Sequence, residues 1–171
     1  MSQRPTSTEV PEYARAYVAL APEEDVIAAL EKQGRETAAF FRMLTEDKAS
    51  YRYAPGKWSI KEVLGHFTDG ERIFGYRALA IARGESKSLP GFDEESYAAA
   101  SNAGSRSIRD LADEYEAVRR STLALVRGLA NESWTKSGTA NDTPISVRAI
   151  AWIILGHERH HLRVLHERYG V

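Results

Sequence analysis

Apolar residues recur every three or four positions along four long stretches of the chain, which is the spacing of one buried helical face. The four predicted helices span residues 22–44, 59–82, 107–129 and 146–170. The last three begin at Ser59, Ser107 and Ser146, and the first two of these serines have an acidic residue three positions later, the spacing of a capping box. Gly170 suits the end of the last helix.

The connections between these helices differ in length. Residues 51–58 and 131–144 are predicted as short loops, whereas residues 84–105 form a long crossover. Within it, Pro90-Gly91 marks a turn and Asp93 suits the cap of a short helix through Tyr97. No stretch shows the alternation of a strand. The pattern therefore predicts an all-α fold, a four-helix bundle with its long crossover between helices two and three.

The whole chain, residues 1–171, is predicted to be one domain, because no shift in composition divides it. Residues 1–21 contain some apolar side chains, and we expect them to pack on the bundle as an N-terminal extension.

Four of the five histidines lie in the last predicted helix. At about 100° per residue, His161 falls about 40° and His160 about 60° from His157, so all three share the apolar face. His166 lies about 180° away and is expected on the surface. Because His157 and His161 are four residues apart, they could coordinate one metal ion from adjacent turns of the helix.

A third ligand has to come from another helix, since His160 leaves the helix on the opposite flank of His157. The one remaining histidine is His66, midway along the second helix. Gly65 and Gly156 each precede one of these histidines, and a glycine inside a helix indicates a packing or clearance requirement. Two other readings stay open: hydrogen-bonded core histidines, and a HExxH zinc protease site with Glu158 as its base.

Composition and charge exclude several classes of protein. The net charge is −1, from 23 Lys and Arg against 24 Asp and Glu, so the chain lacks the excess of positive charge that favours binding to nucleic acid or an acidic membrane. The absence of cysteine excludes disulfides, zinc–thiolate sites and a cysteine nucleophile. No apolar run has the length of a membrane span, and the N-terminus lacks the apolar segment of a signal peptide, so we expect a cytoplasmic protein.

Three stretches of the chain resemble the DinB-like superfamily, which groups bacillithiol and mycothiol S-transferases with metal-dependent hydrolases. They are "YRYAPGKWSIKEVLGHFTDGERIFGYRALAIARGE", "LPGFDEESYAAAS" and "SVRAIAWIILGHERHHLRVLHERYG". The resemblance implies an up-down-down-up bundle, a homodimer, and a divalent metal, zinc or nickel, bound by His66, His157 and His161.

The function expected from this resemblance is a metal-dependent enzyme that acts on a small molecule, as a low-molecular-weight-thiol S-transferase or as a hydrolase. Asp69 and Glu158 are candidates for proton transfer or for a hydrogen bond to a ligand, although Glu158 better fits an ordinary surface carboxylate. Arg77 could hold a substrate carboxylate at the cavity mouth, or be an ordinary solvated or salt-bridged arginine. Residues 90–97 of the crossover could line the cavity. A metal-binding stress protein without turnover and a plain helical dimerisation module are the alternatives.

Overall fold

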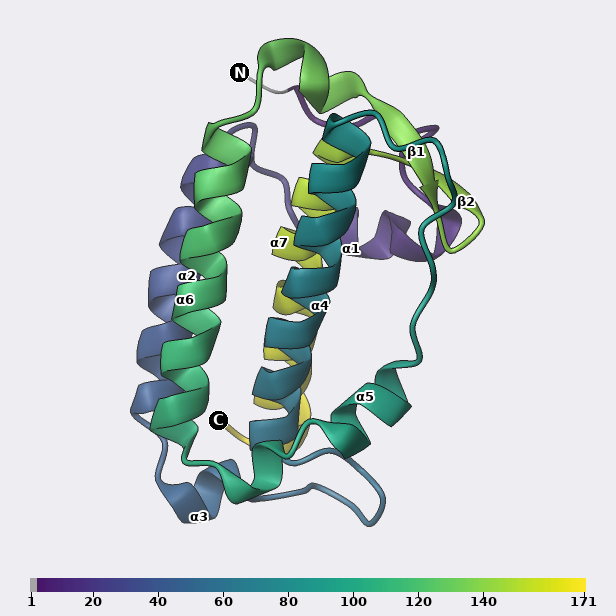
Figure 1. Cartoon of the computed structure of the whole chain (residues 1–171). Helices are drawn as coiled ribbons and strands as arrows, with labels where there is room; N and C mark the ends of the chain where they lie inside the picture. The colour runs from purple at the N-terminus through teal and green to yellow at the C-terminus, as the bar shows by residue number, and fades with distance from the viewer. Residues whose placement is uncertain (1–2) are drawn as a thin grey trace.

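The computed structural model describes residues 3–171, so the first two residues of the predicted N-terminal extension lie outside it. Four long helices lie side by side (Figure 1): α2 (Val26–Arg42), α4 (Ile60–Ala82), α6 (Ile108–Arg127) and α7 (Val147–Val164). Helix α6 packs against α2 and α4, and α7 packs against α4. The predicted four-helix bundle is confirmed.

The long crossover gives the bundle its topology. It carries α5 (Glu94–Ala100) and returns the chain to the end of the bundle where α4 begins, so α4 and α6 run in the same direction (Figure 1). Helices α2 and α7 run the other way. The up-down-down-up order is therefore confirmed.

Side-chain caps fix where the helices start. Ser59, Ser107 and Ser146 each accept the backbone N–H three residues later, and Ser59 and Glu62 form a complete capping box. The first helix begins at Val26 rather than after Pro22, because Asp25 caps it and the preceding acids stay outside. At the other end of the chain α7 continues into a π-helical turn, Leu165–Tyr169, and Gly170 stops it with a φ of 65°.

The prediction that residues 131–144 form only a loop is wrong. A 3₁₀ turn (Asn131–Thr135) precedes strand β1 (Ser137–Ala140), which pairs antiparallel with β2 (Thr143–Ser146). Asn141 and Asp142 both have positive φ, as the type I′ form of a two-residue hairpin turn requires. Strands of four residues are too short for alternating hydrophobicity to reveal them. A short helix, α3 (Glu46–Ala49), was also missed.

The N-terminal segment lies against the last helix. Its 3₁₀ turn (Glu12–Ala14) leads into α1 (Arg15–Ala19), which packs on α7. Gly156 makes this contact possible, because a Cβ there would lie 1.9 Å from the backbone oxygen of Tyr17. The glycine before His157 therefore serves helix packing rather than clearance for a ligand.

Two hydrophobic clusters fill the bundle, one toward each end. On α4, for example, Phe67 belongs to one cluster and Phe74 to the other. Between the clusters each long helix contributes buried polar or charged side chains: Gln33, Thr37, His66, Glu71, Arg119, His157 and Glu158. We call these residues, with Tyr115 and His161, the polar layer. Within residues 3–171, none of the helices combines the length and the hydropathy needed to cross a membrane.

Candidate metal centre

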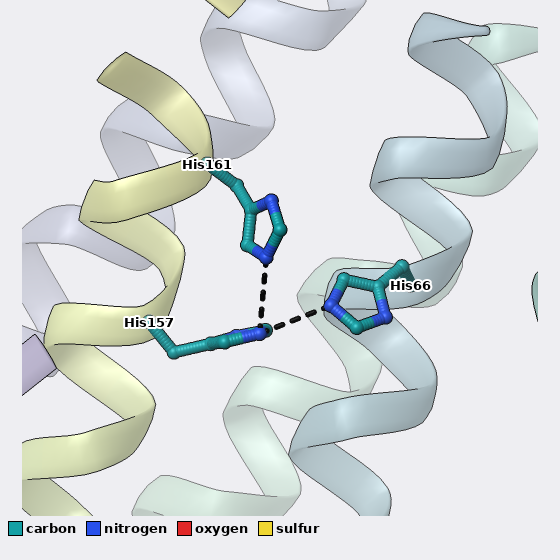
Figure 2. A group of neighbouring side chains, drawn as sticks. All are labelled: His66, His157 and His161. Atoms are coloured by element: carbon teal, nitrogen blue, oxygen red, sulfur yellow. Dashed lines mark hydrogen bonds between the residues drawn. The ribbon is translucent and has the colours of Figure 1, made fainter. Parts of the chain in front are cut away.

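Three imidazoles meet inside the polar layer. Figure 2 shows His66 of α4 facing His157 and His161, which lie on successive turns of α7. The Nε2 atom of His157 lies 3.0 Å from Nε2 of His66 and 3.2 Å from Nε2 of His161. One ring nitrogen from each residue lies within 4.8 Å of the other two. The structure thus brings together the three residues that the resemblance implies as ligands.

Hydrogen bonding among the rings alone does not account for this arrangement. An imidazole nitrogen carries either one proton or one in-plane lone pair, so it forms one well-aligned hydrogen bond. Nε2 of His157 has two such neighbours. In a tetrahedral zinc site with Zn–N bonds of about 2.0–2.1 Å, ligand nitrogens lie about 3.3 Å apart. The donor set therefore fits a shared divalent cation.

Burial keeps these imidazoles uncharged at neutral pH. It lowers the pKa of His66 to about 4 and that of His161 to about 3. The pKa of His157 falls well below its usual value, first through burial and then through its histidine neighbours. His66 and His157 are only 4% and 7% exposed. Because a metal ligand needs the neutral ring, no proton has to be displaced before a cation binds.

A pocket of about 290 Å³ opens onto this cluster and is lined by His160 and His161 of α7. Trp58 forms part of its wall, with its ring centroid 4.9 Å from that of His66. Glu94 and Glu95, from the start of α5, line the pocket as well, and Glu95 accepts a hydrogen bond from Trp58 Nε1 at 2.9 Å. The predicted place of residues 90–97 near the cavity agrees with this lining. The described residues also form a larger hollow, of about 800 Å³, between α2 and α7, but none of the three histidines lines it.

The other two histidines stay outside the cluster. His160 packs edge-on against Tyr17 of α1, with ring centroids 5.4 Å apart, and faces the pocket rather than His66. His166 is exposed, as predicted, and its Nδ1 lies 3.1 Å from the backbone oxygen of Val171. The helical wheel thus separates the converging rings from the others.

Asp69 and Arg77 do not line the pocket. Asp69 is paired with Arg72 at 3.5 Å, and partial burial raises the pKa of its carboxyl group. Arg77 is 3% exposed, and its guanidinium donates a hydrogen bond of 2.7 Å to the backbone oxygen of Pro90. The expectation that Arg77 lies at the cavity mouth or in solvent is wrong: it ties the crossover to α4.

The expectation that Glu158 is a surface carboxylate is also wrong, because its side chain is 3% exposed. One carboxylate oxygen accepts a hydrogen bond from Thr37 at 2.5 Å, and the other accepts one from Arg119 at 2.5 Å. The hydroxyl of Tyr115 lies 3.0 and 2.9 Å from the two oxygens. With its oxygens occupied and no access to the pocket, Glu158 is not placed to exchange protons with a substrate.

Sequence reasoning missed the partners of Glu158. Arg119 binds both oxygens of Glu71, at 2.7 and 2.8 Å, as well as Glu158. A signal was present: Glu71 lies four residues after Phe67, and Arg119 four residues after Tyr115, so both interrupt an apolar stripe. A charged residue at such a position has to find a buried partner.

Comparison with known proteins agrees with the fold. The sequence model of the DinB superfamily matches residues 29–165, which is most of the chain and includes all three clustered histidines. The chain belongs to the DinB superfamily. No curated protein matches this member of the superfamily.

One solved structure has the same fold over nearly its full length. YfiT from Bacillus subtilis, described as a probable metal-dependent hydrolase with an unusual four-helix bundle topology, is 18% identical, with a TM-score of 0.67. The similarity covers 99% of this chain and 94% of YfiT. At this identity the likeness shows that the two DinB-like bundles share a fold.

Proposed function

We propose that this protein is a metal-dependent hydrolase that holds a divalent cation with His66, His157 and His161. The observation that carries the proposal is the convergence of three uncharged imidazoles, two buried and one partly buried, next to a pocket. The description of YfiT as a probable metal-dependent hydrolase supports the same class of activity.

Zinc or nickel is the cation we propose, since imidazole nitrogen suits both ions. Three protein ligands would leave a coordination position open on such an ion, and zinc held there would supply the acidity that makes water a nucleophile at neutral pH. The chain's own contribution is to hold three imidazoles together, to keep them uncharged, and to pack the rings of Trp58 and Tyr17 against them.

The pocket favours a small substrate without negative charge. Its volume of about 290 Å³ is at the lower end for a small-molecule site. Tyr53, Trp58 and Tyr169 provide aromatic surface. Glu94 and Glu95 line the pocket with two carboxylates against one ammonium, that of Lys57, which disfavours acidic molecules.

The size of the pocket also bears on the choice between hydrolysis and thiol transfer. A thiol S-transferase has to hold a thiol and an electrophile together, whereas a hydrolase holds one substrate beside a water. About 290 Å³ suits the second case better. The low-molecular-weight-thiol transferase, the metal protein without turnover and the helical dimerisation module are the alternatives. Homodimeric assembly and the identity of the substrate stay predictions.

The first test is metal content. Protein purified without a histidine tag should contain close to one zinc or nickel ion per chain, measured by mass spectrometry. His157→Ala should contain none, while His160→Ala, which changes a histidine outside the cluster, should bind as wild type does. Absence of a bound divalent metal from the wild-type protein, before and after reconstitution, would overturn the proposal.

The second test is turnover. Zinc-loaded protein is assayed against small neutral and cationic chromogenic esters and amides, with and without added thiols. We expect hydrolysis that is independent of thiol and absent from His157→Ala. A rate that requires the thiol would instead support the transferase, and stoichiometric metal without turnover on any substrate would support the non-catalytic alternative.

A further inference from the structure

The polar layer contains a second cluster, formed by Arg119 with Glu71 and Glu158, that the proposed hydrolase chemistry does not use. All three side chains are buried, with 2–4% of their surface exposed. Arg119 Nε and one terminal nitrogen bind Glu71, that same nitrogen binds Glu158, and the other donates to the backbone oxygen of Leu30 at 2.9 Å. The cluster joins all four long helices, because Leu30 belongs to α2.

The charges in this cluster do not balance. With both carboxylates ionised, two negative charges face one guanidinium, and the remaining donors to Glu158 are the neutral hydroxyls of Thr37 and Tyr115. Among residues 3–171, Arg119 is the one cationic side chain within 4.0 Å of Glu71 or Glu158. An uncompensated buried charge costs several kcal/mol. With both carboxylates ionised, the core of the bundle would carry one negative charge in excess of its guanidinium.

The two carboxylates lie next to the histidine cluster. A cavity of about 10 Å³ is lined by His157, Glu71 and Glu158, together with three apolar residues (Phe67, Phe74 and Ile154). That volume is about the least that admits one water molecule. The apolar surroundings weaken dielectric screening between the carboxylates and any charge held by His157.

We propose that Glu71 and Glu158 are positioning residues for the cation, acting through His157 and supplying the negative charge that three neutral imidazoles lack. The inference rests on the proposed metal site. A ligand that binds through Nε2 keeps its proton on Nδ1, and this N–H is oriented by an acceptor on the far side of the ring. The cavity leaves room for one water to carry that hydrogen bond to the carboxylates.

The test compares zinc affinity among variants of the full, untagged chain, by calorimetry against a competing chelator. Glu71→Gln keeps the shape and removes the charge, and should weaken zinc binding by about 10- to 100-fold, the usual effect of losing a partner behind a metal ligand. Glu158→Gln should do the same. Glu114→Gln is the control: that carboxylate also pairs with arginines, Arg72 and Arg106, but does not border the cavity. It should stay within about threefold of wild type.

A second readout does not depend on any variant folding. The ¹⁵N spectrum of the wild-type chain without metal should show His157 as the Nδ1–H tautomer, opposite to the preference of free imidazole side chains. A merely structural role for the carboxylates would lower stability in Glu71→Gln and Glu158→Gln without changing zinc affinity.

Unchanged affinity in both folded variants, or a predominant Nε2–H tautomer of His157, overturns the inference. Failure of the metal site itself is distinguishable, because wild-type protein would then bind no zinc at all, whatever the tautomer.

Discussion

The arginine cluster and the histidine cluster in the middle of the bundle are built from similar numbers of side chains. They differ in how far their hydrogen-bonding atoms find partners. Around Arg119 each guanidinium nitrogen finds an acceptor and each carboxylate oxygen finds a donor. In the histidine cluster the Nε2 atoms meet one another, and His157 has two partners for one hydrogen-bonding position. The first cluster is closed, whereas the second lies beside a pocket.

This difference distinguishes polar groups that stabilise the fold from polar groups that are suited to binding a ligand. Buried donors and acceptors that match one another stabilise the native state or cost little. Three imidazole nitrogens that lie this close together gain little from each other and would gain much from a shared cation. The comparison therefore assigns a structural role to the arginine cluster and the binding capacity to the histidines.

The largest expected effect breaks the closed cluster. Arg119→Met should lower the free energy of unfolding by about 3–5 kcal/mol, because two buried carboxylates lose their cation. Urea denaturation with a chelator present measures it. Arg120→Met removes the neighbouring arginine, which is 66% exposed and pairs with Glu116 at 3.5 Å, and should cost less than about 0.5 kcal/mol. A loss below about 1 kcal/mol for Arg119→Met would contradict the assignment.

Acid should destabilise the folded protein through the histidine cluster. The pKa values of His66 and His161 fall to about 4 and about 3 in the folded chain, so below the unfolded value of 6.5 the unfolded state takes up protons first. Stability of the metal-free protein is therefore lost as pH falls from 6.5 toward 4 and 3. The two rings should contribute a loss of about 2–3 kcal/mol between pH 7 and 5.5. Urea denaturation at both pH values measures this loss.

The control for this titration is the double variant His66→Gln with His161→Gln. It should lose less stability over the same pH interval, since the carboxylates that also titrate are unchanged. An equal loss in the double variant would show that other groups dominate the response to acid.

A smaller effect is expected where α1 covers the histidines. Gly156→Ala places a methyl group against the backbone of Tyr17, whose ring lies 5.3 Å from that of His157. The displacement of α1 should cost about 1–3 kcal/mol in denaturant unfolding. Gly104→Ala, where a Cβ meets nothing within 4 Å, is the matched control and should be neutral. Wild-type stability of Gly156→Ala would mean that α1 moves aside freely.

The smallest effect is expected at the pocket wall. Trp58→Phe keeps an aromatic ring but removes the exposed hydrogen bond to Glu95, so stability should change by less than about 1 kcal/mol. Zinc affinity, measured by calorimetry, should stay within about threefold. A tenfold loss of zinc affinity would show that Trp58 contributes to cation binding, so that the site would not be limited to the histidine cluster.

Much of the fold could be predicted because its signals are local. Capping serines act within one turn, and the apolar stripes need only helical periodicity, so Ser59, Ser107 and Ser146 mark true helix starts. The hairpin at Asn141-Asp142 was missed because positive φ values and four-residue strands leave little trace in hydrophobicity. The helical wheel also placed His161 on the apolar face and His166 on the surface, since both positions follow from the geometry of one helix.

The partners across the bundle depend on tertiary structure. The sequence by itself determined that four amphipathic helices form, and that His157 and His161 share a face, because helix geometry links residues three or four apart. Only packing decided that His66 meets them, that Gly156 admits α1, and that Glu158 faces Arg119 and Glu71 instead of solvent. These contacts join residues dozens of positions apart, and their geometry is set by how the helices cross rather than by any local pattern.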